Sequence, residues 1–118
     1  MPKAMSPEER ALRQQVIDAC LEMNASGINQ GTSGNVSARW EEGLLVTPSG
    51  VPYVELEPED IVYMGLDGSY EAKDGLKPSS EWRFHVDIMA VRPYVTALVH
   101  THSMYATTIA TKGLDIPA

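Results

Sequence analysis

The segment 36–47 reads VSARWEEGLLVT and carries the clearest fold signal in the chain. Val36, Ala38 and Trp40 alternate with polar residues, which is typical of a half-buried strand whose side chains point alternately to two faces. The Glu-Glu-Gly that follows predicts a turn, and the apolar run at 44–47 predicts a second strand paired with the first. A hairpin is therefore the first predicted unit of a sheet.

A helix is predicted before this hairpin. In Ser6-Pro7-Glu8-Glu9, Ser6 can cap the first turn and Glu9 can complete a capping box. Apolar residues then repeat at helical spacing, and Gly27 is a natural end. The members of this stripe are Leu12, Val16, Ala19, Cys20 and Met23. Because Cys20 lies on the stripe, the pattern favours a small core thiol over a nucleophile.

The sequence after the hairpin predicts elements of both kinds. In chain order these are a helical turn at 56–60, strands at 61–66 and 69–72 joined by Asp67-Gly68, a helix at 81–91, a strand at 95–100 and a helix at 103–112. Ser79 and Ser80 can cap the helix at 81–91. This order favours an α/β fold with a mixed or antiparallel sheet.

Composition limits the possible functions. The chain has 118 residues, enough for one domain spanning 1–118, and it is 43% hydrophobic and 21% charged, as globular proteins are. With 16 Asp and Glu against 9 Lys and Arg, the net charge of -7 argues against nucleic-acid binding. A single cysteine, no signal-peptide pattern and no apolar run long enough to cross a membrane predict a cytoplasmic protein.

The most specific local feature is His100-Thr101-His102. Residues two apart share one face of a strand, so both imidazoles could bind one metal ion. A satisfied or surface histidine pair would also explain so short a motif. The position favours the metal hypothesis, since the pair ends an apolar strand just before a predicted helix, where sites of α/β proteins tend to form.

Three loops of small residues suggest a phosphate-binding site. They are Gly31-Thr32-Ser33-Gly34-Asn35, Thr47-Pro48-Ser49-Gly50 and Pro78-Ser79-Ser80. Each lies at a predicted strand or helix end, where N–H groups and hydroxyls can bind a phosphate without lysine. Any one of them is explained equally well as a turn or cap. Three such loops in one acidic chain, together with the candidate metal pair, make a phosphorylated ligand more credible. Because the net charge repels anions, such a ligand must be held locally by N–H groups or a metal.

Glu81 begins the helix predicted at 81–91. The helix dipole alone favours a carboxylate there. A functional role, as a base or a metal ligand, is the alternative. His85 lies one turn further and could share that face, but the pattern favours a packed or hydrogen-bonded histidine over a ligand.

Together these segments resemble the class II aldolase/adducin family. The resemblance rests on four motifs in the same order: Asn29-Gln30-Gly31-Thr32-Ser33-Gly34-Asn35-Val36-Ser37, Thr47-Pro48-Ser49-Gly50, Lys77-Pro78-Ser79-Ser80-Glu81-Trp82-Arg83-Phe84-His85 and Val99-His100-Thr101-His102-Ser103. It covers nearly the whole chain from Pro7 onward. It implies a three-layer α/β/α fold with a mixed, largely antiparallel central sheet.

Within the family the chain is most similar to the aldolases that cleave L-fuculose 1-phosphate into dihydroxyacetone phosphate and L-lactaldehyde. The resemblance implies one Zn²⁺ per subunit, bound by His100 and His102, with Glu81 as catalytic acid/base and as a further metal ligand. It also implies a phosphate site formed by Gly34, Asn35, Ser49, Gly50, Ser79 and Ser80. The family analogy suggests a homotetramer.

The chain differs from the family pattern in its length. Family members have about 200 residues, and their third zinc-binding histidine has no counterpart within these 118 residues. We therefore expect the N-terminal portion of such a domain. Two alternatives stay open: a 4-epimerase acting on a pentulose 5-phosphate, whose members usually carry aspartate in place of Glu81, and a non-catalytic binding module or inactive fragment.

Overall fold

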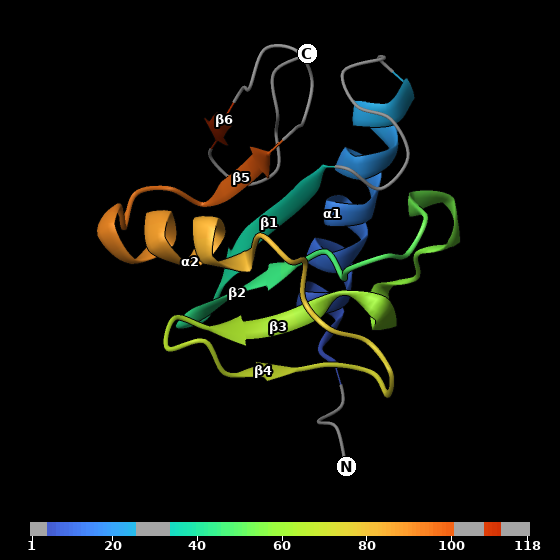
Figure 1. Ribbon diagram of the computed structural model, residues 1–118, viewed down its shortest axis with the longest axis horizontal. Coiled ribbons are helices and arrows are strands. Elements are labelled where there is room, and N and C mark those ends of the chain that lie inside the picture. The colour runs from blue at the N-terminus through green and yellow to red at the C-terminus, as the bar shows by residue number, and fades with distance from the viewer. Residues whose placement is uncertain (1–4, 26–33, 101–107, 112–118) are drawn as a thin grey trace.

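The computed structural model describes residues 5–25, 34–100 and 108–111. These residues form one sheet with a helix on each side. The sheet is six-stranded and antiparallel, in the order β4-β3-β2-β1-β5-β6. Its strands are β1 (Asn35–Trp40), β2 (Gly43–Val46), β3 (Val62–Gly65), β4 (Tyr70–Glu71), β5 (Ala97–His100) and β6 (Thr108–Thr111). Figure 1 shows α1 (Pro7–Ala25) on one side and α2 (Trp82–Val91) on the other. The predicted α/β/α class is confirmed.

The central hairpin is buried on both faces. In β2, Leu45 packs into the cluster below α1, whereas Leu44 and Val46 pack into the cluster below α2. This is the period of two that strands impose. The sequence predicted a half-buried β1, but Asn35–Ala38 are all buried because a helix covers each face. The polar Ser37 fits this environment because it bonds to His85 of α2.

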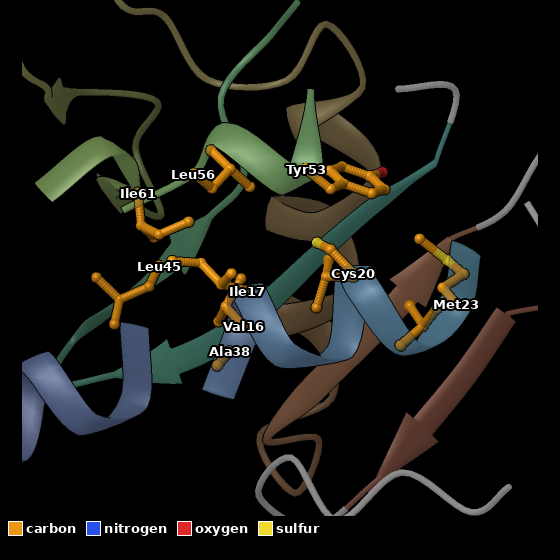
Figure 2. Packing of buried hydrophobic residues seen from close by; sticks show 11 residues of the cluster. Val16, Ile17, Cys20, Met23, Ala38, Leu45, Tyr53, Leu56 and Ile61 are labelled. Atoms are coloured by element: carbon orange, nitrogen blue, oxygen red, sulfur yellow. The ribbon is translucent and has the colours of Figure 1, made fainter. Parts of the chain in front are cut away.

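Helix α1 follows the predicted stripe. Ser6 Oγ accepts a hydrogen bond of 3.1 Å from the Glu9 N–H, which confirms the cap, and the Glu9 carboxylate binds Arg13. The buried stripe of Val16, Ile17, Cys20 and Met23 packs against Leu45, Ala38, Tyr53, Leu56 and Ile61 (Figure 2). Cys20 is fully buried, so it is a core residue, as predicted, and burial raises the pKa of its thiol.

The later elements match the predictions up to His100. The turn at 56–60 is the 3₁₀ helix Pro58–Asp60, Asp67-Gly68 lies in the turn between β3 and β4, and β5 ends at His100. The predicted helix at 103–112 is wrong for 108–111, which form β6 beside β5, and its other positions lie outside the described residues. The β-branched Thr108, Ile109 and Thr111 favour an extended backbone, and β5 offers them an edge for pairing. Within the described residues, no helix is long and apolar enough to cross a bilayer.

Arg39, in β1, donates hydrogen bonds to the C-terminal end of α2 and to the loop that follows it. Its Nε donates to the Val95 carbonyl at 2.9 Å, and its Nη2 donates to the carbonyls of Met89 at 2.8 Å and Arg92 at 3.2 Å. Those carbonyls lie at or just beyond the last turn of α2, where helices leave acceptors unsatisfied. One guanidinium therefore holds α2 in its place over the sheet.

We expect Arg39→Lys to lower the free energy of unfolding by about 1.5–3 kcal/mol, because an ammonium cannot donate to three carbonyls in this planar arrangement. Chemical denaturation measures the change. Arg83→Lys is the matched control, since Arg83 is exposed and stacks on Trp82. Equal stability of the two variants would contradict this role for Arg39.

Candidate active site

The topology gathers three predicted site residues at one end of the sheet. Asn35 opens β1 and His100 ends β5, and the two are paired directly across the antiparallel ladder. Glu81 occupies the position just before α2, at the N-terminus of that helix. Residues separated by up to 65 positions in sequence thus meet at one point only because the strands run antiparallel and α2 crosses above them.

Glu81 and His100 approach each other closely. Glu81 Oε1 lies 3.4 Å from His100 Nδ1, and both side chains are partly buried, with exposed fractions of 33% and 18%. The ring of Phe84 stacks on the His100 ring, with centroids 4.5 Å apart. A carboxylate and an imidazole therefore share a partly shielded environment in which one ring face of His100 is covered.

A second histidine supports this pair from within the core. His85 is fully buried, and its ring nitrogens contact Ser37 Oγ at 2.7 Å and Asn35 Oδ1. Desolvation, reinforced by the nearby His100, lowers the pKa of His85 to about 3, so its ring is neutral. His85 is thus the hydrogen-bonded histidine that the sequence favoured. Asn35 completes the link by donating from Nδ2 to Glu81 Oε1 at 2.8 Å.

Two of the predicted phosphate loops lie side by side. Pro48 and Pro78 form an isolated bridge, the Ser49 N–H donates to the Lys77 carbonyl, and the Ser79 N–H donates to the Thr47 carbonyl, both at 2.9 Å. These two N–H groups are therefore engaged between the loops.

The small residues at the tips of these loops differ in whether a phosphate could reach them. Ser49, Gly50 and Ser80 are exposed, whereas Ser79 is buried and its Oγ caps the Glu81 N–H. The positive φ of 76° at Gly50 favours glycine there. Of the first loop, Gly34 is described, and its carbonyl accepts a hydrogen bond from Tyr53.

The sequence interpretation missed the hydrogen bonds among Ser37, His85, Asn35 and Glu81. A signal was present in the polar Ser37, which interrupts an apolar strand and needs a partner if buried. Its partner could not be predicted, because only the position of α2 over β1 brings His85 to it. Phe84 was also missed as the residue stacked on His100.

The described residues fit part of a zinc site. Zinc prefers imidazole and carboxylate ligands, and the structure places one of each, His100 and Glu81, within 3.4 Å. The second predicted imidazole, His102, lies outside the described residues. Within the described part of the chain, no group of three or more potential ligands occurs.

Comparison with known proteins identifies the family. The model of the class II aldolase and adducin N-terminal domain matches residues 14–118. The chain belongs to this family. It is 45% identical over 111 residues to an L-fuculose phosphate aldolase of Escherichia coli K12, covering 94% of this chain and 51% of the relative.

Two further comparisons bear on the branch of the family. A 5-methylthioribulose-1-phosphate/5-deoxyribulose-1-phosphate aldolase of Rhodospirillum rubrum is 49% identical over 108 residues, covering 92% of this chain and 48% of the relative. The crystal structure of an L-fuculose-1-phosphate aldolase from Thermus thermophilus superposes with a TM-score of 0.67 at 31% identity, covering 80% of this chain and 47% of that one. This chain therefore spans about half the length of these relatives.

Proposed function

We propose that this chain forms the phosphate-binding and proton-transferring part of a zinc-dependent aldolase that cleaves a sugar 1-phosphate, L-fuculose 1-phosphate being the first candidate. The observation that carries the proposal is the approach of Glu81 to His100 beside the paired loops at 47–50 and 77–80. The proposal includes the homotetramer that the family analogy suggests, which mass measurement in solution would test.

The chain's own residues would divide the work between binding and proton transfer. Gly34, Asn35, Ser49, Gly50, Ser79 and Ser80 would bind the phosphate and so fix the remote end of the substrate. Breaking the bond between the α- and β-carbons of the ketose, with loss of the β-hydroxyl proton to water, releases the aldehyde and leaves an enediolate on the dihydroxyacetone phosphate half. In the cleavage direction, Glu81 would supply the proton that the α-carbon of the enediolate gains. In the aldol direction, Glu81 would remove that proton.

His100 and Glu81 would hold the zinc ion together with His102. When bound, zinc would supply a Lewis acid that stabilises negative charge on the substrate oxygens as it develops. The ring of His85 is neutral and the Asn35 amide is uncharged, so neither places a positive charge beside Glu81.

The relatives support a second candidate substrate. Identity to the 5-methylthioribulose-1-phosphate/5-deoxyribulose-1-phosphate aldolase of Rhodospirillum rubrum is 49%, against 45% to the fuculose-phosphate enzyme of Escherichia coli K12. Substrates of both kinds carry a phosphate on the carbon next to the carbonyl. The loops at 47–50 and 77–80 would bind the phosphate of either substrate. They therefore do not distinguish between the two substrates, which differ at the aldehyde end.

The decisive experiment measures dihydroxyacetone phosphate released by the zinc-loaded protein from L-fuculose 1-phosphate and from 5-deoxyribulose 1-phosphate. Uptake of solvent deuterium into dihydroxyacetone phosphate tests the proton-transfer half alone. Release from either sugar supports the aldolase proposal and ranks the two substrates. Interconversion of pentulose 5-phosphates without a triose product would indicate the epimerase. Absence of cleavage, exchange and zinc binding would leave the binding-module alternative.

We expect His100→Ala to remove bound zinc, since a carboxylate and one imidazole rarely retain the ion without a third protein ligand. Elemental analysis after dialysis against a zinc-buffered solution measures the metal content. Asp87→Asn is the control, because Asp87 is exposed on α2. A His100→Ala protein that keeps the zinc content of the control would contradict the metal assignment.

A further inference from the structure

Four polar side chains form a continuous line from the middle of β1 to the site. Ser37 Oγ lies 2.7 Å from His85 Nδ1, and His85 Nε2 contacts Asn35 Oδ1. Asn35 Nδ2 lies 2.8 Å from Glu81 Oε1. We call this line the Ser37–Glu81 relay. It joins the interior of the sheet to the Glu81 carboxylate, which faces His100.

The hydrogen atoms of the relay have one consistent arrangement. Asn35 donates from its NH₂ group to Glu81 Oε1 and presents its carbonyl oxygen to His85 Nε2. His85 Nε2 must then carry a hydrogen and donate to that carbonyl. Because the ring is neutral, Nδ1 is an acceptor, and Ser37 donates its hydroxyl hydrogen to it. Every link is satisfied in one direction only.

Burial makes this arrangement rigid. Ser37 and His85 are fully buried, and Asn35 is only 3% exposed. Rotating the Asn35 amide would set its oxygen against the Glu81 carboxylate oxygen and its NH₂ group against the Nε2–H of His85, so both hydrogen bonds would be lost. His85 therefore fixes which end of Asn35 faces Glu81.

We propose that His85 is a positioning residue that holds the Glu81 carboxylate toward His100 by locking the Asn35 amide. This inference rests on the proposed function of Glu81 and adds a residue that touches neither substrate nor metal. Ser37 bonds to Nδ1 of His85 and so lies one step further from the site.

The test compares His85→Leu with His85→Gln in the zinc-loaded protein. Leucine removes the donor to Asn35, whereas the glutamine amide nitrogen can take the place of Nε2–H. We expect His85→Leu to lower kcat by about 10- to 100-fold and His85→Gln to recover most of that loss. Val86→Ala is the matched control, because Val86 is a buried α2 neighbour whose truncation destabilises the protein without touching the relay.

The ¹⁵N NMR spectrum of the histidine rings in the wild-type chain provides a readout that is independent of activity. We expect His85 to be neutral with its hydrogen on Nε2. The proposal would be overturned if His85→Leu folded and had the kcat of the control. It would also be overturned if His85→Gln lost as much kcat as His85→Leu. A hydrogen on Nδ1 would overturn it as well, even if His85→Leu failed to fold.

The same spectrum separates the two proposals. A wild-type protein that shows the predicted tautomer but neither cleaves sugar phosphates nor exchanges deuterium would overturn the proposed function and leave the geometry of the relay intact. An active protein with the opposite tautomer would overturn the positioning role alone.

Discussion

Glu81→Gln is expected to lower the rate of sugar-phosphate cleavage by about 100- to 10,000-fold, the usual contribution of a general acid or base. Glutamine keeps the size of the side chain and an Oε1 that can still accept from Asn35, whose Nδ2 lies 2.8 Å from it. The substitution removes the exchangeable carboxyl proton and also replaces a proposed zinc-binding carboxylate by an amide, so zinc content is measured beside the rate. Steady-state release of dihydroxyacetone phosphate measures the effect.

The deuterium exchange of dihydroxyacetone phosphate should fall by a similar factor, because it depends on the same proton transfer. Glu71→Gln is the control: Glu71 is exposed in β4, on the edge strand of the sheet, and should keep full activity. Phosphate binding by Glu81→Gln, measured by titration with inorganic phosphate, should match that of the control. Parallel loss of binding and turnover would mean that Glu81 has mainly a structural role.

Leu45→Ala is expected to lower the free energy of unfolding by about 2–5 kcal/mol, because it leaves a cavity in a well-packed core. Leu45 is fully buried, and Figure 2 shows it among Ile17, Ala38 and Ile61, between the sheet and α1. A loss of this size is a large fraction of the total stability of about 5–15 kcal/mol that small domains have.

The urea midpoint of unfolding measures this loss. Val54→Ala is the matched control, since Val54 is 81% exposed and its truncation should change stability by less than about 0.5 kcal/mol. If both variants unfolded at the same urea concentration, the packing of α1 on β2 would not be a main source of stability.

Local patterns were sufficient for most of the secondary structure. The alternation of Val36 and Ala38 predicted β1, and the Ser6 cap with its apolar stripe predicted α1. Both signals depend on side chains a few residues apart, so one sequence contains them. The helix predicted at 103–112 was wrong at 108–111, because pairing with β5 depends on a neighbour that local propensity does not include.

The site was predicted only as a set of residues. The sequence indicated that Glu81 and His100 belong together, through the family resemblance, and the structure places them 3.4 Å apart. The sequence could not indicate that Asn35 and His85 lie between the core and Glu81. Each of these contacts spans more than 40 residues of chain, and a hydrogen bond across that interval depends on how the strands pair.

By itself the sequence determined where the chain turns from helix to strand, which residues are apolar enough to be buried, and which family supplies its motifs. Tertiary structure alone decided that Ser37 is buried against His85, that the loops at 47–50 and 77–80 pair, and that the Asn35 amide has one orientation. The reason is physical. Periodicity is a local property of the backbone, whereas the partner of a buried polar group is set by which elements pack together.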